Sequence, residues 1–142
     1  MRILKVKTRE RKIGNIGERA AARYLFFRGY RILKRNAVFD SHEVDILAKR
    51  GHEIVFVEVK TRSEETLSEF DPPPRCAVTK EKMTAIIGEA RTHYGMLRYK
   101  NERYRVRFDV IEVYLKNGRV DRIEHLIAAY TTDTAKAWRT KK

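Results

Sequence analysis

The sequence contains a single cysteine, Cys76, among its 142 residues. One cysteine excludes internal disulfides and fits a reducing compartment, so we expect a cytoplasmic protein. No run of apolar residues approaches the ~18 that a membrane-spanning helix needs. The basic N-terminus also has no apolar segment of secretory length. We therefore expect a soluble chain with no membrane partner.

Several motifs that carry chemistry in other proteins are also missing. The sequence has no Gly-rich phosphate loop, no Ser-His-Asp arrangement and no dinucleotide fingerprint, and its four histidines lack the spacing of a zinc site. Acidic residues are few, because 19 Asp and Glu stand against 32 Lys and Arg, for a formal net charge of +13. Such an excess favours polyanions, nucleic acid first and anionic membrane second, although a merely soluble basic protein can share it.

The length and a hydrophobic content of 42% predict a single domain, residues 1–142, with a buried core. Its ends are a basic, flexible or edge segment (1–12) and a basic tail (131–142). Hydrophobic periodicity and turn signals give the elements between them. We expect helices at 13–28 and 79–97, strands at 30–39, 43–49, 53–61, 104–115 and 119–126, and a mobile loop at 63–76 around the three prolines.

The expected order is therefore α-β-β-β-α-β-β. The run Ile54-Val-Phe-Val57 is apolar on both faces, which is typical of a central strand covered on both sides. We predict an α/β fold, a three-layer sandwich in which helices flank a mixed central sheet.

The most informative stretch is the hairpin predicted over residues 43–61. Gly51-His52 suits a two-residue turn, which would make paired positions sum to 103 and set Asp45 directly opposite Glu58. A three-residue turn would slide the pairing and set Asp45 against Val57, mixing charged and apolar residues on each face. The two-residue turn instead leaves one face wholly apolar. That face would pair Val44 with Val59, Ile46 with Val57, and Ala48 with Val55.

Two facing carboxylates destabilise a sheet unless a cation lies between them, so the pair Asp45 and Glu58 predicts a divalent-metal site. Mg²⁺ prefers carboxylate oxygens and keeps several waters. The two acids would supply two ligands, and the carbonyl of Val59 a third. Lys60, on the same face, would orient a water or stabilise charge on a phosphate. Glu43, opposite Lys60, would support the site or pair with that lysine. The alternative is a Lys60–Glu43 ion pair beside two solvated acids.

Glu18 is a further candidate, on the first helix. It lies away from the apolar stripe of that helix and is flanked by Gly14 and Ala21, and small residues let a ligand or backbone approach closely. The alternative is an ordinary solvated glutamate. Four basic residues would hold phosphates near the site, given the net charge of the chain. They are Arg62, Arg75, Lys80 and Lys82.

Four short motifs occur in order along residues 13–130. They are Gly17-Glu-Arg-Ala-Ala21, Glu43-Val-Asp-Ile-Leu47, Phe56-Val-Glu-Val-Lys-Thr-Arg62 and Arg107-Phe-Asp-Val110. Together they resemble the YraN-like family of small bacterial proteins. That family is similar to archaeal-type Holliday-junction resolvases and to the wider PD-(D/E)xK nuclease superfamily. Val44 stands where the superfamily motif has Pro, and His42 where a Gly would be expected.

This resemblance implies a restriction-endonuclease-like core, dependence on Mg²⁺ or Mn²⁺, and often a homodimer. By the same likeness Asp45, Glu58 and Lys60 match the catalytic core, and Glu18 matches a helix glutamate that supports the metal. The sequence thus predicts a metal-dependent nuclease acting on branched or structured nucleic acid, DNA rather than RNA. The alternatives are a catalytically weak nucleic-acid-binding accessory in DNA processing or uptake, and a basic accessory for RNA or ribosomes.

Overall fold

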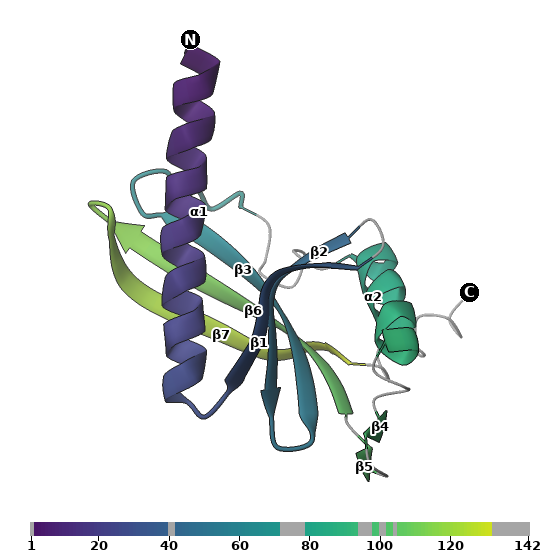
Figure 1. Cartoon of the computed structure of the whole chain (residues 1–142). Helices are drawn as coiled ribbons and strands as arrows, with labels where there is room; N and C mark the ends of the chain where they lie inside the picture. Colours follow the sequence, from purple (N-terminus) through teal and green to yellow (C-terminus); the bar gives the residue numbers. More distant parts are fainter. Residues whose placement is uncertain are drawn as a thin grey trace.

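A computed structural model describes residues 2–39, 42–71, 79–93, 98–99, 102–103 and 105–131 of the protein (Figure 1). Within these residues the helices are α1 (Arg2–Phe27) and α2 (Lys80–His93). The strands are β1 (Arg31–Phe39), β2 (His42–Arg50), β3 (Glu53–Ser63), β4 (Arg98–Tyr99), β5 (Glu102–Arg103), β6 (Arg105–Lys116) and β7 (Arg119–Thr131). Neither helix, within the described residues, combines the length and the apolar character that crossing a membrane requires.

Five strands form one mixed sheet in the order β1-β2-β3-β6-β7. Strands β3 and β6 are parallel, and the other neighbours are antiparallel. Helix α1 packs on one face through Ala21 and Leu25, and α2 packs on the other through Met83 and Ile86. The predicted α/β class with a mixed central sheet is confirmed, and the arrangement is compatible with the predicted three-layer sandwich. The additions are the two-residue strands β4 and β5, which pair with each other.

Strand β3 lies at the centre of the sheet and is buried on both faces, as its continuous apolar run predicts. Ile54 and Phe56 join the cluster under α2, whereas Val55 and Val57 join the cluster under α1. Phe56 stacks on Phe108 of β6 with ring centroids 5.1 Å apart. This strand therefore ties the two halves of the core together.

The hairpin register is the predicted one. Ile46 pairs with Val57 and Ala48 with Val55, so paired positions sum to 103. Gly51 has a φ of +59°, which suits the first central position of a two-residue turn. The three-residue turn that the sequence left open is wrong.

The alternation of faces breaks near Asp45, contrary to the expectation that Val44 and Ile46 share a face. Val44 lies in the α2 cluster and Ile46 in the α1 cluster. The break lies beside Asn36 of β1, whose φ of +52° is in the left-handed region. The neighbouring pairs Arg35–Ile46 and Ala37–Val44 bracket this position. Sequence alternation alone does not predict this change of face.

The first helix begins much earlier than predicted. Residues 2–12, expected to be a flexible or edge segment, form the start of α1, whose N-terminal part projects beyond the sheet (Figure 1). The segment lacks an apolar stripe, but it also lacks Gly and Pro and is rich in strong helix formers. The predicted stop is confirmed. Gly29 has a φ of +87°, and the amides of Gly29 and Tyr30 donate to the carbonyls of Phe26 and Leu25.

Of the remaining predicted boundaries, the start of the second helix is confirmed and the end of the last strand is wrong. Thr79 caps α2, because its Oγ1 accepts a hydrogen bond from the Lys82 amide at 3.1 Å. Strand β7 runs to Thr131 rather than to residue 126. The predicted end of the second helix at 94–97, the segment 72–78 with Arg75, and the tail beyond Thr131 lie outside the described residues.

A buried polar network fixes β6 against β7. The Asp109 carboxylate is fully buried and accepts hydrogen bonds from Arg107 Nε and Nη2 and from the Ala128 amide at 2.8, 2.9 and 2.9 Å. His125 Nε2 lies 2.7 Å from the same carboxylate. Burial alone would raise the pKa of Asp109, but the hydrogen bonds from His125, Arg107 and Ala128 outweigh it and hold that pKa below its usual value. The Asp109 carboxylate therefore ties β6 to β7 through Arg107, His125 and the Ala128 amide.

Helix α1 approaches β3 most closely at Gly17. A Cβ at this position would overlap Oγ1 of Thr61 and come within 2.9 Å of its Cβ. A Cβ at Gly14, one turn earlier, would meet nothing within 4 Å. Only the second glycine is therefore required by packing.

The two glycines give a matched test of this contact. Gly17→Ala should lower the free energy of unfolding by about 1–3 kcal/mol, because the added methyl overpacks the helix–strand contact. Gly14→Ala should raise it by about 0.5–1 kcal/mol through helix propensity alone. Urea unfolding of the two variants and of wild type would measure both changes in the free energy of unfolding. The Gly17→Ala/Thr61→Ala double variant should recover part of the loss, and independent, additive effects would contradict the contact.

Removing the Asp109 carboxylate should also destabilise the fold. Asp109→Ala should cost about 3–5 kcal/mol, since it removes the carboxylate that accepts from the buried Arg107 and from the Ala128 amide and leaves Glu53 as the remaining acidic partner of that arginine among the described residues. Because folding lowers the pKa of Asp109, the stability it contributes is complete above the pKa of the unfolded chain and is lost as pH falls through the lower folded pKa. Urea unfolding from pH 7 down to pH 3 would measure the loss. A wild-type-like Asp109→Ala variant would contradict this role, and Glu124→Ala, an exposed acid on β7, serves as the control.

Candidate active site

Asp45 and Glu58 lie where the hairpin strands β2 and β3 cease to pair. The described pairing of these strands ends at Ile46 and Val57. Beyond it, Oδ2 of Asp45 accepts a hydrogen bond from the Val59 amide at 2.8 Å. A side-chain carboxylate thus replaces a carbonyl as the acceptor, which fixes Asp45 beside the strand that carries Glu58. The structure brings the two predicted acids together.

Both carboxylates are costly to keep charged. Burial raises the pKa of Glu58, and the negative charge of Asp45 raises it further. Burial also raises the pKa of Asp45, against the lowering effects of the Val59 amide and of Lys82. Two half-buried acids that repel each other form a site of concentrated negative potential, in a chain whose net charge is strongly positive.

Lys82 of α2 lies directly on this acidic pair. Its Nζ is 2.6 Å from Oε1 of Glu58, and the two side chains are 19% and 15% exposed. Lys82, which the sequence predicts to contact phosphate, instead lies against this carboxylate. The available signal was its spacing, because Lys82 lies four residues before the buried Ile86 and so shares the inward face of the helix.

Lys60 is placed differently. Its side chain is exposed, and its charge lowers the pKa of both Asp45 and Glu58 without a direct ion pair to either among the described residues. The alternative Lys60–Glu43 ion pair is likewise not formed within the described part of the chain. Glu43 instead faces the side-chain amide of Asn36, whose nitrogen would donate to Oε1 of Glu43 at 3.2 Å in the amide orientation that satisfies both groups.

Glu18 of α1 lies next to the same site. Burial raises its pKa, and the charge of Asp45 is the next contribution. Its Oε2 is 3.4 Å from Nη2 of Arg35, and in the same orientation of the Asn36 amide the nitrogen would also donate to this oxygen at 3.3 Å. Asn36 thus links Glu18 to Glu43. Sequence reasoning missed Arg35 and Asn36, which no motif marked and which only the pairing of β1 with β2 brings close.

The close approach at Gly17 positions Glu18, its immediate neighbour. A cavity of about 330 Å³ opens beside it, between α1 and the end of β3. It is lined by Ile13, Gly14, Glu18, Val59, Thr61, Ser63 and Thr66. The hollow therefore reaches from Glu18 to the strand segment that carries the predicted ligands.

The acidic side chains of the candidate site provide part of the ligand set that a divalent cation requires. No three His, Cys, Asp or Glu side chains converge on a common centre within the described residues. Asp45 and Glu58 nevertheless offer two carboxylates near enough for the charge of Asp45 to raise the pKa of Glu58. Mg²⁺ is commonly held by one or two carboxylates while it keeps several waters. The residues present would suit such an ion with Asp45, Glu58 and the Val59 carbonyl as ligands.

The basic residues predicted to bind phosphate take different positions. Nε of Arg62 lies 2.7 Å from Oε2 of the buried Glu112, and its Nη1 lies 3.4 Å from Asp71, so this guanidinium anchors the loop after β3. Lys80 begins α2, two residues before Lys82. Arg75 lies outside the described residues.

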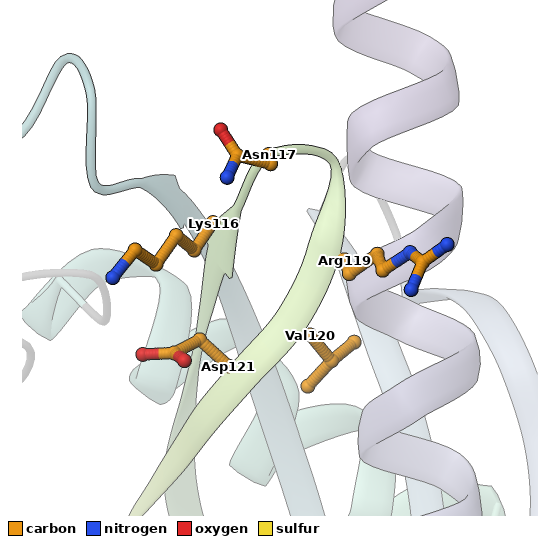
Figure 2. A pocket seen from close by; sticks show the side chains of 5 residues that line it. All are labelled: Lys116, Asn117, Arg119, Val120 and Asp121. Atoms are coloured by element: carbon orange, nitrogen blue, oxygen red, sulfur yellow. The ribbon is translucent and has the colours of Figure 1, made fainter.

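A larger hollow of about 510 Å³ lies at the turn between β6 and β7, away from these acids. It is lined by Lys116, Asn117, Arg119, Val120 and Asp121. Figure 2 shows Lys116 and Asp121 extending to one side of the hairpin and Arg119 and Val120 to the other, so the five side chains do not meet at one centre. The turn therefore lacks the convergent groups that a catalytic site needs.

Neutralising Asp45 should stabilise the metal-free protein. Folding raises the pKa of this acid, so its charged form costs stability above the folded pKa, and the cost disappears as pH falls below the unfolded pKa. Asp45→Asn keeps an acceptor for the Val59 amide and should gain about 0.5–2 kcal/mol at pH 7.5 in EDTA. Urea unfolding at several pH values should show the gain shrinking toward pH 4. If the variant were less stable than wild type at pH 7.5, the charged Asp45 carboxylate would not be destabilising the fold.

The motifs that build this site fall within a recognised family. A family model described as "Uncharacterised protein family UPF0102" matches residues 17–113. A UPF0102 protein of Caldanaerobacter subterraneus is 36% identical over 126 residues, which is 87% of this chain and 98% of the relative. One from Caldicellulosiruptor saccharolyticus is 42% identical over 114 residues, 79% and 92% of the two chains. One from Clostridioides difficile is 40% identical over 110 residues, 78% and 91%. The resemblance to the YraN-like family is confirmed, and the chain belongs to the protein family UPF0102.

Proposed function

We propose that this protein is a metal-dependent endonuclease that hydrolyses phosphodiester bonds in branched or otherwise structured DNA. The observation that carries the proposal is the pair Asp45 and Glu58, half-buried and mutually repulsive where β2 and β3 separate. A fold gains nothing in stability from such a pair. A divalent cation, Mg²⁺ or Mn²⁺, is the simplest ligand that would use it.

Each residue of the site has a role in this proposal. Asp45, Glu58 and the Val59 carbonyl hold the cation, and the Val59 amide fixes the Asp45 carboxylate through Oδ2. When bound, such an ion supplies a water of lowered pKa and a polarised phosphodiester oxygen. Lys60, with an exposed ammonium, orients the water or stabilises charge that builds on the phosphate.

Glu18 and Glu43 support the ligands from α1 and β2. Asn36 joins the two acids, and Arg35 neutralises Glu18, so their carboxylates are held in place before substrate arrives. The DNA backbone is held by the basic surface, including Lys80, Lys82 and Arg75. Arg62 supports the end of β3 through its contacts with Glu112 of β6 and with Asp71 of the following loop.

A second function is favoured by one observation, the ion pair of Lys82 with Glu58. That contact partly neutralises the acidic pair without any metal. The corresponding proposal is a nucleic-acid-binding accessory in DNA processing or uptake, which keeps the fold and the basic surface but has little or no catalysis.

Cleavage assays separate the two functions. Labelled four-way junction, flap, single-stranded and duplex DNA would be incubated with the protein in Mg²⁺, Mn²⁺ or EDTA. We expect metal-dependent cutting, with the branched substrates preferred. Asp45→Asn should abolish it, and Lys60→Met should lower kcat by about 10²–10³-fold, as loss of one preorganised cation at the phosphate does. Glu18→Gln should cost about 10–100-fold.

The control is Asp121→Asn, which removes one exposed carboxylate at the β6–β7 turn. It should cut like wild type. DNA binding without cutting in any metal, unchanged in Asp45→Asn, would reject the nuclease and support the accessory function.

A further inference from the structure

Lys82 brings positive charge to a place where helix electrostatics disfavour it. Helix α2 begins at Lys80, so Lys82 lies in its first turn, next to the positive end of the helix dipole. Its Nζ nevertheless approaches Glu58 to 2.6 Å, and its charge also lowers the pKa of Asp45. The ammonium therefore compensates both acids of the candidate active site.

A divalent cation and this ammonium compete for the same carboxylate. While Oε1 of Glu58 accepts the 2.6 Å hydrogen bond of Lys82, the ammonium takes up negative charge that a metal ligand would supply and repels a second cation placed beside it. The two side chains are largely shielded from water, which strengthens the existing pair and makes the competition matter. Lys60 does not compete in this way, because its side chain is exposed and makes no such ion pair among the described residues.

We propose that Lys82 is a tethered counter-ion that occupies the cation position in the metal-free protein, leaves Glu58 when a divalent metal binds, and then holds a DNA phosphate. This proposal deepens the nuclease function above and rests on its metal site. Once displaced, the ammonium remains on α2 beside the metal, where a phosphate of the substrate is the nearest anion available to it. Lys82 is thus a positioning residue that couples metal binding to DNA binding.

Metal affinity tests the first half of the proposal. Mn²⁺ binding would be measured by isothermal titration calorimetry for wild type, Lys82→Met and Lys80→Met. Both variants lose one positive charge from the first turn of α2, so general electrostatics change alike. Lys82→Met should bind Mn²⁺ about tenfold more tightly than Lys80→Met, because a charge-assisted hydrogen bond no longer opposes binding. Lys82→Arg, which keeps the charge, should bind like wild type.

DNA affinity tests the second half. Binding of a labelled four-way junction would be followed by fluorescence anisotropy across a range of salt, in EDTA and in Ca²⁺. In EDTA, Lys82→Met should match wild type, because Glu58 then holds the lysine. In Ca²⁺ it should bind more weakly, with a salt slope smaller by about 0.9 for one lost phosphate contact. Lys80→Met should show the same change in both conditions.

The outcomes separate this inference from the function beneath it. Equal Mn²⁺ affinity in Lys82→Met and Lys80→Met would overturn the tethered counter-ion while leaving a metal-dependent nuclease intact. Failure of every variant to bind Mn²⁺ would overturn both. A Lys82→Met defect in DNA binding that is the same with and without metal would overturn the coupling. Lys82→Gln provides a second neutral variant should Lys82→Met lose its fold by circular dichroism.

Discussion

Strand β3 must bury its side chains on both faces of the sheet, because it lies at the centre with one helix packed on each face. The positions of the helices and of the candidate site depend on this burial. Val55 and Val57 pack under α1, whereas Ile54 and Phe56 pack under α2. The same alternation continues past the core, where Glu58 points to the α2 side and meets Lys82. The next residue, Val59, lines the cavity beside α1. Burial of an apolar strand therefore delivers functional groups to both helices.

The acidic site is a local exception in a chain with a net charge of +13. Asp45, Glu58 and Glu18 all have raised pKa values, and burial is the leading cause for each. Lysines and arginines around the site offset part of this cost, as the contacts of Lys82 with Glu58 and of Arg35 with Glu18 show. A stable fold alone would have no use for this arrangement, and the balance between acids and neighbouring cations is where ligand binding would act.

The hairpin was predictable because two physical requirements agree there. A two-residue turn and an apolar face both demand the register that pairs Ile46 with Val57, and the central position of β3 follows from its uninterrupted apolar run. Residues 2–12 are not predicted as part of a helix, because the segment has no stripe of apolar residues at helical spacing. Val44 and Ile46 lie in different core clusters although they are two residues apart, so strict alternation along β2 places Val44 on the wrong face. The contact of Lys82 with Glu58 depends on how α2 packs on the sheet, and no local sequence pattern specifies that packing.

The left-handed residue Asn36 in edge strand β1 has a counterpart in β7, the strand at the opposite edge of the sheet. The outer strand β1 also shifts register between Ile32 and Lys34, and the other outer strand, β7, carries Ala128 at a φ of +53° beside its own shift. The inner pair β3–β6, by contrast, runs in parallel from Glu53 to Ser63 without a shift. Irregular borders make poor templates for a further strand, so the sheet resists lengthening through its margins. A second copy of the chain would have to meet this one through side chains rather than by continuing the sheet.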